Sequence, residues 1–234
     1  MVPIGHAAPQ EPFVLATLER TGRAGATADR VSAVLTEAIL CGGFRPGAHL
    51  NADTLARQLG LSHIPVREAL RSLHAEGWVE MRPHSGAFVR SRTPQELADL
   101  FEMRLLLESQ AAALAAERRS ATQLDELARI LDAQAAATNA PELASINEQF
   151  HHTVAACSHN GILTDAIRRL GRRARFYFLT VAPKRRADSL REHRQLTDAI
   201  RRRDVDAAAT IARDHIAHTR ADVHDALRVT DAIG

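Results

Sequence analysis

The sequence predicts a mainly α-helical protein with two domains: a winged helix-turn-helix of three helices and a small β-hairpin wing, followed by an all-α antiparallel helical bundle. Two observations support this prediction. Residues 29–90 contain short helical patterns, turn signals and then a hairpin pattern, whereas helical periodicity alone continues from residue 93. Of the 234 residues, 45% are hydrophobic, which is enough to fill the cores of two modest domains.

The first part of the chain is predicted to hold a tail and one helix. Residues 1–28 are rich in Pro, Gly, Ala and Thr, so we expect a mobile N-terminal tail. Residues 29–40 show an amphipathic pattern that ends at Gly42 and Gly43, and this helix would pack under the next two.

Residues 50–89 carry the helix-turn-helix pattern. Asn51 is a good N-cap for a first helix that ends at Gly60, and Ser62 is expected to cap a second helix that ends at Gly77. Residues 78–81 and 87–89 form strand patterns on either side of a turn at 82–86. A helix, a turn, a second helix and a hairpin make a shape that fits a major groove.

The second helix has one cationic face. His63, Arg67 and Arg71 recur at steps of four, so they share a face, and the apolar stripe lies about a hundred degrees away. Such a face can hold phosphates and present arginine forks to guanine edges. The alternative is a solvated pair of surface arginines. The short turn before this helix and the hairpin after it favour the nucleic-acid interpretation.

Residues 29–90 resemble the winged helix-turn-helix of the GntR family of bacterial transcription regulators. The resemblance rests on the run GLSHIPVREAL at 60–70, followed by EGWVE at 76–80 and by Gly86-Ala87. It implies that this domain contacts DNA, with a hairpin-tip residue in the minor groove; the residues assigned to DNA are Ser62, His63, Arg67, Arg71 and His84. Many members have arginine where His63 stands, and imidazole is shorter and mostly neutral at pH 7.

Composition limits the other possibilities. The formal net charge is only +2, so contact with nucleic acid must come from a local patch. Cys41 and Cys157 make no disulfide framework, which favours a reducing compartment. The sequence has no apolar run long enough for a membrane span, and residues 1–28 lack the layout of a signal peptide. We therefore expect a cytoplasmic protein that does not enter membranes.

Residues 91–92 are predicted to be a linker, and residues 93–231 a bundle of helices. Thr93-Pro94 with Glu96 is a clear helix start. Helices joined by short links form an antiparallel bundle; the predicted ranges are 94–118, 121–137, 141–158, 162–181, 188–202 and 205–229.

Three of these helices place a histidine where the pattern calls for an apolar residue. The stripes with a polar interruption are Leu143, Asn147, His151 and Val154; Leu190, His193, Thr197 and Ile200; and Ala208, Ile211, His215 and His218. Converging neutral imidazoles suit a divalent metal: zinc first, with nickel, copper or iron(II) as other choices. The alternative is that these histidines face inward by chance and are satisfied by ordinary hydrogen bonds.

The bundle resembles the FCD effector domain, the helical partner of one GntR subfamily. The matching pieces are NEQFH at 147–151, SLREH at 189–193 with DAI at 198–200, and His215-Ile216. The resemblance implies a metal held by the residues Asn147, His151, His193 and His215, with Asn147 where other members have Asp or Asn. It also implies a small organic acid as effector.

Two residues are candidates for the effector pocket. Arg104 shares the inner stripe of residues 94–118 and can pair with a carboxylate. Its alternative is an intrahelical ion pair with Glu108. Tyr177 can line the same cavity, although core packing is its more ordinary role.

These expectations together describe a DNA-binding transcription regulator, and a repressor in particular. A homodimer would bind a short palindromic operator in double-stranded DNA, and a small carboxylate effector in the metal-containing pocket would control that binding. Two alternatives stay open. One is a helical zinc-dependent hydrolase with an appended DNA-binding-like domain, although the sequence shows no HExxH motif. The other is a scaffold whose histidines are structural.

Overall fold

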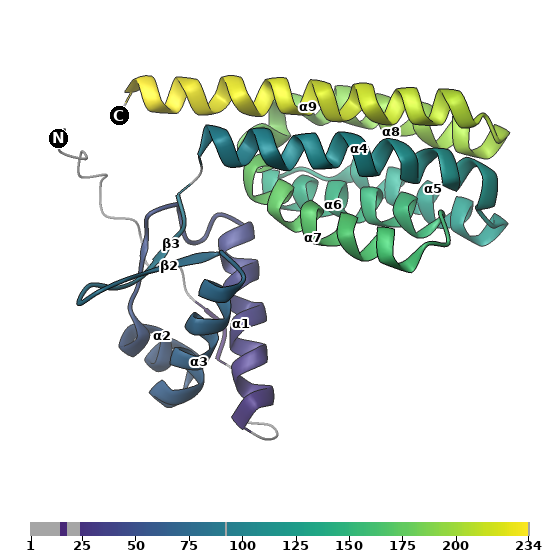
Figure 1. The fold of residues 1–234 in the computed structure, drawn as a ribbon. Helices are drawn as coiled ribbons and strands as arrows, with labels where there is room; N and C mark the ends of the chain where they lie inside the picture. Colours follow the sequence, from purple (N-terminus) through teal and green to yellow (C-terminus); the bar gives the residue numbers. More distant parts are fainter. Residues whose placement is uncertain (1–14, 18–23, 92, 234) are drawn as a thin grey trace. The chain divides into compact units, whose positions relative to one another are not determined.

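The chain forms two compact units in the computed structural model, Met1–Arg92 and Thr93–Gly234 (Figure 1). The structure describes residues 15–17, 24–91 and 93–233. The boundary between the two units falls between residues 92 and 93. Buried apolar residues form a core in each unit.

The first unit contains three helices and a three-stranded sheet. Its elements are α1 (Ala24–Leu40), β1 (His49–Leu50), α2 (Ala52–Leu59), α3 (His63–Ala75), β2 (Val79–Arg82) and β3 (Gly86–Val89). The strands lie in the order β1-β3-β2, and both pairings are antiparallel. Helix α3 packs on α1 and buries its apolar stripe, Val66, Ala69, Leu70 and Leu73, as the sequence predicts.

Local chemistry fixes both ends of α2, and its C-terminal end begins the turn to α3. The side chain of Asn51 accepts hydrogen bonds from the backbone N–H groups of Asp53 and Thr54, at 3.0 and 2.9 Å. Gly60 ends α2 with a left-handed φ of 68°, where a side chain is strained. A Cβ at this position would also lie 2.9 Å from Cγ2 of Thr17. Both the backbone and the close approach therefore require glycine here.

The first domain begins earlier in the sequence than the predicted boundary at residue 29. Helix α1 begins at Ala24, so residues 24–28 belong to it and not to the expected tail at 1–28. The reason is packing: Ala28 is buried with Val31 and Leu35, and this burial outweighs the low helix propensity of the nearby glycine and threonines. Leu15 is also buried. Residues 1–14 and 18–23 of the predicted tail lie outside the described residues.

Three details of the wing and the caps also differ from the prediction. Strand β1 was not predicted, because two residues are too few for an alternating pattern; it pairs His49 with Phe88. Strand β2 begins at Val79, one residue later than expected. Ser62 has the extended backbone of an N-cap, but its side chain makes no capping hydrogen bond.

The second unit is an all-helical bundle. Its helices are α4 (Pro94–Arg118), α5 (Ala121–Ala136), α6 (Ala140–Ala156), α7 (Gly161–Phe178), α8 (Ala182–Arg202) and α9 (Val205–Ile233). The long helices α4 and α9 lie side by side (Figure 1). Side-chain caps set the helix starts: Thr93 for α4, Ser120 with Gln123 for α5, Asn139 for α6 and Asn160 for α7.

Two bundle helices are longer than predicted. Helix α8 begins at Ala182, six residues before the expected start at 188, because Pro183 lies in its first turn, where no backbone donor is lost. Proline in the first turn thus starts this helix and does not interrupt it. Helix α9 continues to Ile233. No helix in the described ranges is long and apolar enough to cross a membrane.

The bundle core surrounds the histidines that the sequence singles out. It joins apolar residues of α4, α5, α6, α8 and α9. Phe150 lies in this core, and its ring stacks on His193 with centroids 3.9 Å apart and planes at 15°. Packing against Phe150 thus fixes the plane of the His193 imidazole, in addition to its polar contacts.

Candidate metal centre and nucleic-acid interface

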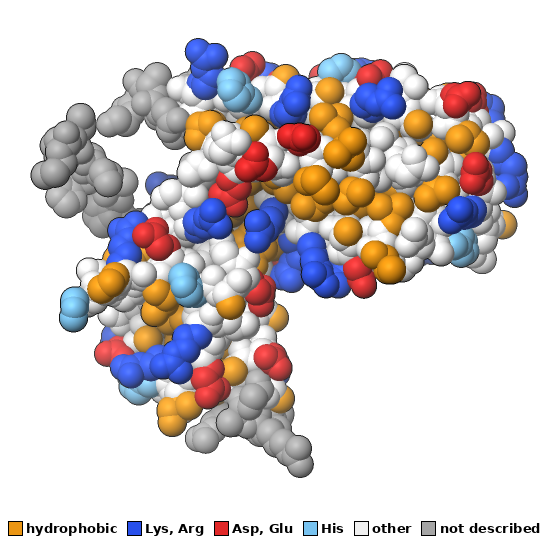
Figure 2. Space-filling view, viewed as in Figure 1, with side chains coloured by type: hydrophobic (Ala, Val, Ile, Leu, Met, Phe, Trp, Pro, Cys, Tyr) orange, Lys and Arg blue, Asp and Glu red, His pale blue; other side chains and the backbone are white. Residues whose placement is uncertain are grey.

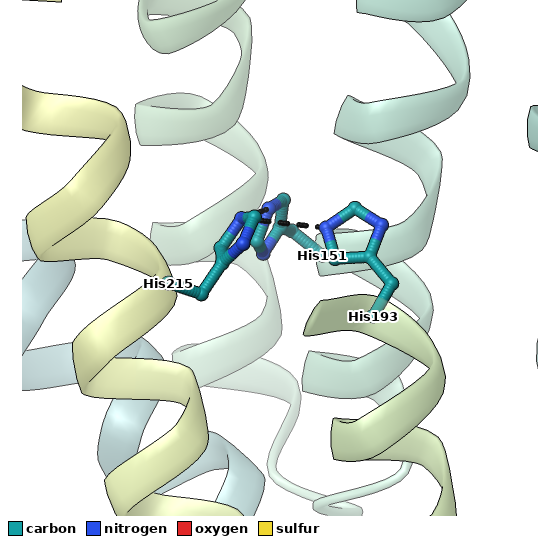
Figure 3. A group of neighbouring side chains, drawn as sticks. All are labelled: His151, His193 and His215. Carbon is teal, nitrogen blue, oxygen red and sulfur yellow. Dashed lines mark hydrogen bonds between the residues drawn. The ribbon is translucent and has the colours of Figure 1, made fainter. Parts of the chain in front are cut away.

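Three histidines from three helices meet inside the bundle: His151 from α6, His193 from α8 and His215 from α9 (Figure 3). The Nε2 atom of His215 lies 3.3 Å from Nε2 of His193 and 3.2 Å from Nε2 of His151. All three side chains are buried. The structure therefore brings these predicted ligands together at their Nε2 atoms.

The opposite nitrogen of each ring faces a hydrogen-bond acceptor. Nδ1 of His193 is hydrogen-bonded to Gln134 Oε1 at 2.8 Å, and Nδ1 of His215 to Glu192 Oε2 at 2.7 Å. Nδ1 of His151 lies 2.7 Å from Glu108 Oε2 as an ion-pair contact, without the geometry of a hydrogen bond. A neutral ring that donates its Nδ1–H keeps its lone pair on Nε2. Three lone pairs then face one another, and they repel unless a proton or a cation lies between them. This is the arrangement in which outer acceptors orient imidazole ligands toward a metal.

The spacing of the Nε2 atoms fits a metal ion. Two nitrogens that each lie about 2.05 Å from a tetrahedral zinc ion are about 3.3 Å apart. The two separations from His215, 3.2 and 3.3 Å, match this value, and all three ligand atoms lie within 4.8 Å of one another. A set of three imidazoles suits zinc, and also nickel, copper or iron(II).

Two arginines hold the outer carboxylates. Arg104 Nε lies 2.5 Å from Oε1 of Glu108, and a guanidinium nitrogen of Arg185 lies 2.5 Å from Oε2 of Glu192. Burial alone would raise the pKa of Glu108, but Arg104 and His151 hold it well below its usual value. Burial acts on Glu192 in the same direction, and His215 and Arg185 lower its pKa to about 2. Both carboxylates are therefore ionised at neutral pH.

His193 and His215 are neutral at neutral pH. Burial lowers the pKa of His215 to about 4, although its contact with Glu192 acts in the opposite direction. Burial, followed by the neighbouring rings, lowers the pKa of His193 well below its usual value. Neutral imidazole is the form that donates a lone pair to a metal.

Asn147 lies on α6 one turn before His151 and is buried, with 5% of its surface exposed. Its Oδ1 atom has no hydrogen-bond partner among the described residues. An unpartnered buried oxygen costs about 1–3 kcal/mol, so this atom is suited to an added ligand. An amide oxygen has the chemistry of a metal ligand, so Asn147 fits as the fourth ligand of the predicted metal site.

The two predicted effector residues are both buried. Arg104 is 1% exposed and forms the intrahelical ion pair with Glu108 that the sequence offered as its alternative role. Tyr177 is 2% exposed and packs edge-to-face on Phe176, with ring centroids 5.6 Å apart. Arg104 is thus connected to the histidines through Glu108, whereas Tyr177 packs in the core beside Phe176.

The space beside the histidines is small. A cavity of about 10 Å³ lies between α4, α6, α7, α8 and α9; it is lined by Glu108, Ala111, His151, Val154, Ile167, Leu196 and Ala212. This volume holds about one water molecule. An organic acid can bind there only if the surrounding side chains move.

Sequence reasoning missed two residues of this site. Gln134 continues the buried stripe of α5, so a polar residue at a core position was its signal. Glu192 directly precedes His193, and no periodicity marked it. His218 follows the inner stripe of α9 but is better explained from the sequence as a bundle-edge residue, and its side chain is indeed 60% exposed, with Nδ1 2.9 Å from Oε1 of Glu192.

The first unit presents a polar groove between α2, α3 and the sheet. It has a volume of about 380 Å³, and its lining includes His49, Asp53, Arg67, Arg71 and Ser85. Arg67 and Arg71 are exposed, as the predicted cationic face of α3 requires. Figure 2 shows basic side chains over α2 and α3.

The remaining predicted contacts are also on the surface. Ser62 and His63 are exposed at the start of α3, and His63 Nδ1 lies 2.8 Å from Oδ1 of Asp53. His84 is exposed in the turn between β2 and β3 with a left-handed φ of 60°. The turn therefore presents an imidazole at its tip, in a backbone conformation that histidine adopts more readily than bulky residues.

Comparisons with known proteins agree with this architecture. Residues 27–89 match the family described as "Bacterial regulatory proteins, gntR family", and residues 99–218 match the family described as "FCD domain". The chain is 33% identical to the Nta operon transcriptional regulator of Aminobacter aminovorans over 74% of this chain and 83% of that protein. It is 29% identical to the galactonate operon transcriptional repressor of Escherichia coli (strain K12), over 81% of this chain and 93% of that protein.

Solved structures share the fold. McbR/YncC of E. coli superposes with a TM-score of 0.74 at 24% identity, over 85% of this chain and 97% of that one. A putative GntR regulator from Rhodococcus sp. RHA1 gives 0.75 at 23% identity, with the same coverage. Nothing in these matches supports the hydrolase alternative. The chain belongs to the GntR family of bacterial transcription regulators, with an FCD domain after its winged helix-turn-helix.

Proposed function

We propose that this regulator is a repressor that binds a short palindromic operator as a homodimer, and that a small organic acid controls this binding from a metal-containing pocket in the bundle. One observation carries the proposal: three buried imidazoles meet at their Nε2 atoms, with separations of 3.2 and 3.3 Å from His215, and the Nδ1 atom of each lies within 2.8 Å of a side-chain oxygen.

The metal ligands we propose are His151, His193, His215 and Asn147. Three neutral nitrogens and one amide oxygen favour zinc, with nickel, iron or copper as other occupants. Asn147 adds no charge, so the bound ion keeps its full positive charge and attracts an anionic ligand. When bound, the metal supplies a Lewis-acid position for a carboxylate oxygen.

The effector we propose is a small carboxylate. Arg104 is the candidate for its charge partner, and its guanidinium is now neutralised by Glu108 at 2.5 Å. An entering carboxylate would compete with Glu108 for this arginine and would enlarge the cavity of about 10 Å³. Tyr177 is proposed to form part of the enlarged wall. One relative is named for a galactonate operon, and galactonate is a small organic acid.

On DNA, Arg67 and Arg71 would contact phosphates and guanine edges, with Ser62, His63 and His84 as further contacts. Two copies of α3 would meet the half-sites of a palindrome by two-fold symmetry. Since its target is the bacterial chromosome, we assign the protein to the cytoplasm.

The homodimer has support from the surface of the bundle. Met103 and Leu106 on α4 and Ile162 on α7 are exposed by 45%, 61% and 86%. Figure 2 shows hydrophobic side chains gathered on the visible face of the bundle. A large exposed apolar face is costly in water unless a partner covers it, and we propose a second copy of this chain as that partner.

Effector binding would act by linkage. A carboxylate that binds one conformation of the dimer better than the other shifts DNA occupancy by that difference in affinity.

Thermal unfolding of the chelator-treated and zinc-loaded protein, screened against small organic acids, tests the proposal. We expect zinc to raise the midpoint, and some carboxylates to raise it further only in the loaded protein. Equal midpoints with and without zinc would contradict it.

A further inference from the structure

Asp53 is an acidic residue on a surface that otherwise suits an anion. It lies in the first turn of α2, and it lines the same groove as Arg67 and Arg71. Its side chain is 66% exposed, so water and a partner can both reach it. A carboxylate there repels the phosphates that the arginines attract. It therefore weakens general attraction to DNA unless it makes a favourable contact of its own.

The contact partner of Asp53 in the chain is His63, the first residue of α3. Oδ1 of Asp53 lies 2.8 Å from Nδ1 of His63, and the imidazole is 56% exposed. This bond joins the N-terminal ends of α2 and α3. In helix-turn-helix docking, base edges are read by the N-terminal residues of the second helix. The pair is thus located where base reading takes place.

The carboxylate of Asp53 can offer only acceptors to a base. Its Oδ1 faces Nδ1 of His63 at 2.8 Å, and its second oxygen, Oδ2, is left to accept a hydrogen bond. In the major groove, only adenine N6 and cytosine N4 offer amino donors. Arg67 and Arg71, by contrast, carry donors that suit guanine. The face therefore has acceptors at one end and donors along its middle.

We infer that Asp53 and His63 together read one base pair of the operator, and that they select the orientation that presents an amino group, cytosine or adenine, to the start of α3. This inference rests on the proposed binding of DNA by α3. It assigns a specificity role to Asp53, beyond its ordinary role as an acid near a helix N-terminus. It also gives His63 a role different from that of an arginine.

Loss of the Asp53–His63 pair would change base preference, whereas loss of an ordinary surface ion pair changes only stability. If Asp53 only stabilised α2 or oriented a surface ring, its removal would affect stability and leave base preference unaltered. If it reads a base, the preference at one operator position must change while the others remain.

Selection from a duplex library with one randomised half-site, at pH 8, measures this preference for the wild type, Asp53→Ala and Asp53→Asn. We expect the wild type to enrich cytosine or adenine at one position, and Asp53→Ala to lose that enrichment by a factor of about five or more. Asp53→Asn keeps an acceptor for His63 and can present an amino donor at the second position. It should therefore shift the preference toward guanine or thymine, whose groove edges accept.

Asp29→Asn is the matched control, because Asp29 is an exposed carboxylate on α1 of the same unit and does not line the groove. It should select the same bases as the wild type. The circular dichroism and unfolding midpoint of each variant show that it is folded. Identical base preferences for wild type and Asp53→Ala would overturn the inference and leave DNA binding by α3 in place. A folded wild type that selects no sequence would overturn both.

Discussion

Oε2 of Glu108 lies 2.7 Å from Nδ1 of His151, while Oε1 of the same carboxylate lies 2.5 Å from Nε of Arg104. One buried carboxylate thus connects the proposed metal ligand with the proposed effector ligand. It fixes the ring of His151, so that Nε2 faces the other histidines. It also neutralises Arg104, which is 1% exposed and has no access to bulk water.

Replacing this carboxylate should affect both metal affinity and stability. Glu108→Gln keeps an oxygen that can accept from His151 but leaves the charge of Arg104 unpaired. We expect metal affinity to fall at least about tenfold, as when other outer partners of metal ligands are removed, and unfolding free energy to fall by about 3 kcal/mol. Competition with a chromophoric chelator and urea unfolding measure the two effects. Glu102→Gln, at an exposed position on α4, is the control; equal effects of the two changes would show that the contact with His151 does not matter.

The cationic face of α3 is tested by Arg67→Ala. Arg67 is exposed, so its loss should leave the fold intact and abolish operator binding. Fluorescence anisotropy with a labelled operator at several salt concentrations gives the affinity and the number of phosphates contacted. Arg129→Ala removes an exposed arginine from the bundle and should change neither quantity. Near-normal binding by Arg67→Ala would exclude α3 as the recognition helix.

The two cysteines should differ strongly in reactivity. Burial raises the pKa of the Cys157 thiol to about 11, while Cys41 is partly exposed. Since the thiolate is the nucleophile, an alkylating reagent at pH 8 should label Cys41 first and Cys157 only when the bundle opens. Peptide mass spectrometry over a time course records both rates. Equal labelling of the two cysteines in the folded protein would contradict the buried position of Cys157.

The sequence predicted most of this architecture because its signals are local. Thr93-Pro94, Ser120 and Asn160 mark helix starts by capping chemistry, which acts within one turn. Tertiary packing explains the errors: the burial of Ala28 extends α1, and the pairing of His49 with Phe88 creates a strand of two residues. Neither effect leaves a pattern within a short window of sequence.

The candidate site was predicted in part for the same reason. His151, His193 and His215 each interrupt an apolar stripe, so periodicity alone marked them. Their partners Gln134 and Glu192 are defined by geometry between helices. Gln134 of α5 faces His193 of α8, and Glu192 of α8 faces His215 of α9. Periodicity within one helix carries no information about such a partner.

The most direct test of the central claim is the metal content of the purified protein and of His193→Ala, measured by elemental analysis after equilibration with zinc. His224→Ala, which removes an exposed histidine of α9, is the control. We expect about one equivalent per chain in the wild type and in the control, since three neutral imidazoles and Asn147 complete a tetrahedral set. His193→Ala should hold little metal and keep its DNA affinity. Equal metal content in His193→Ala and the wild type would contradict a metal centre at these histidines.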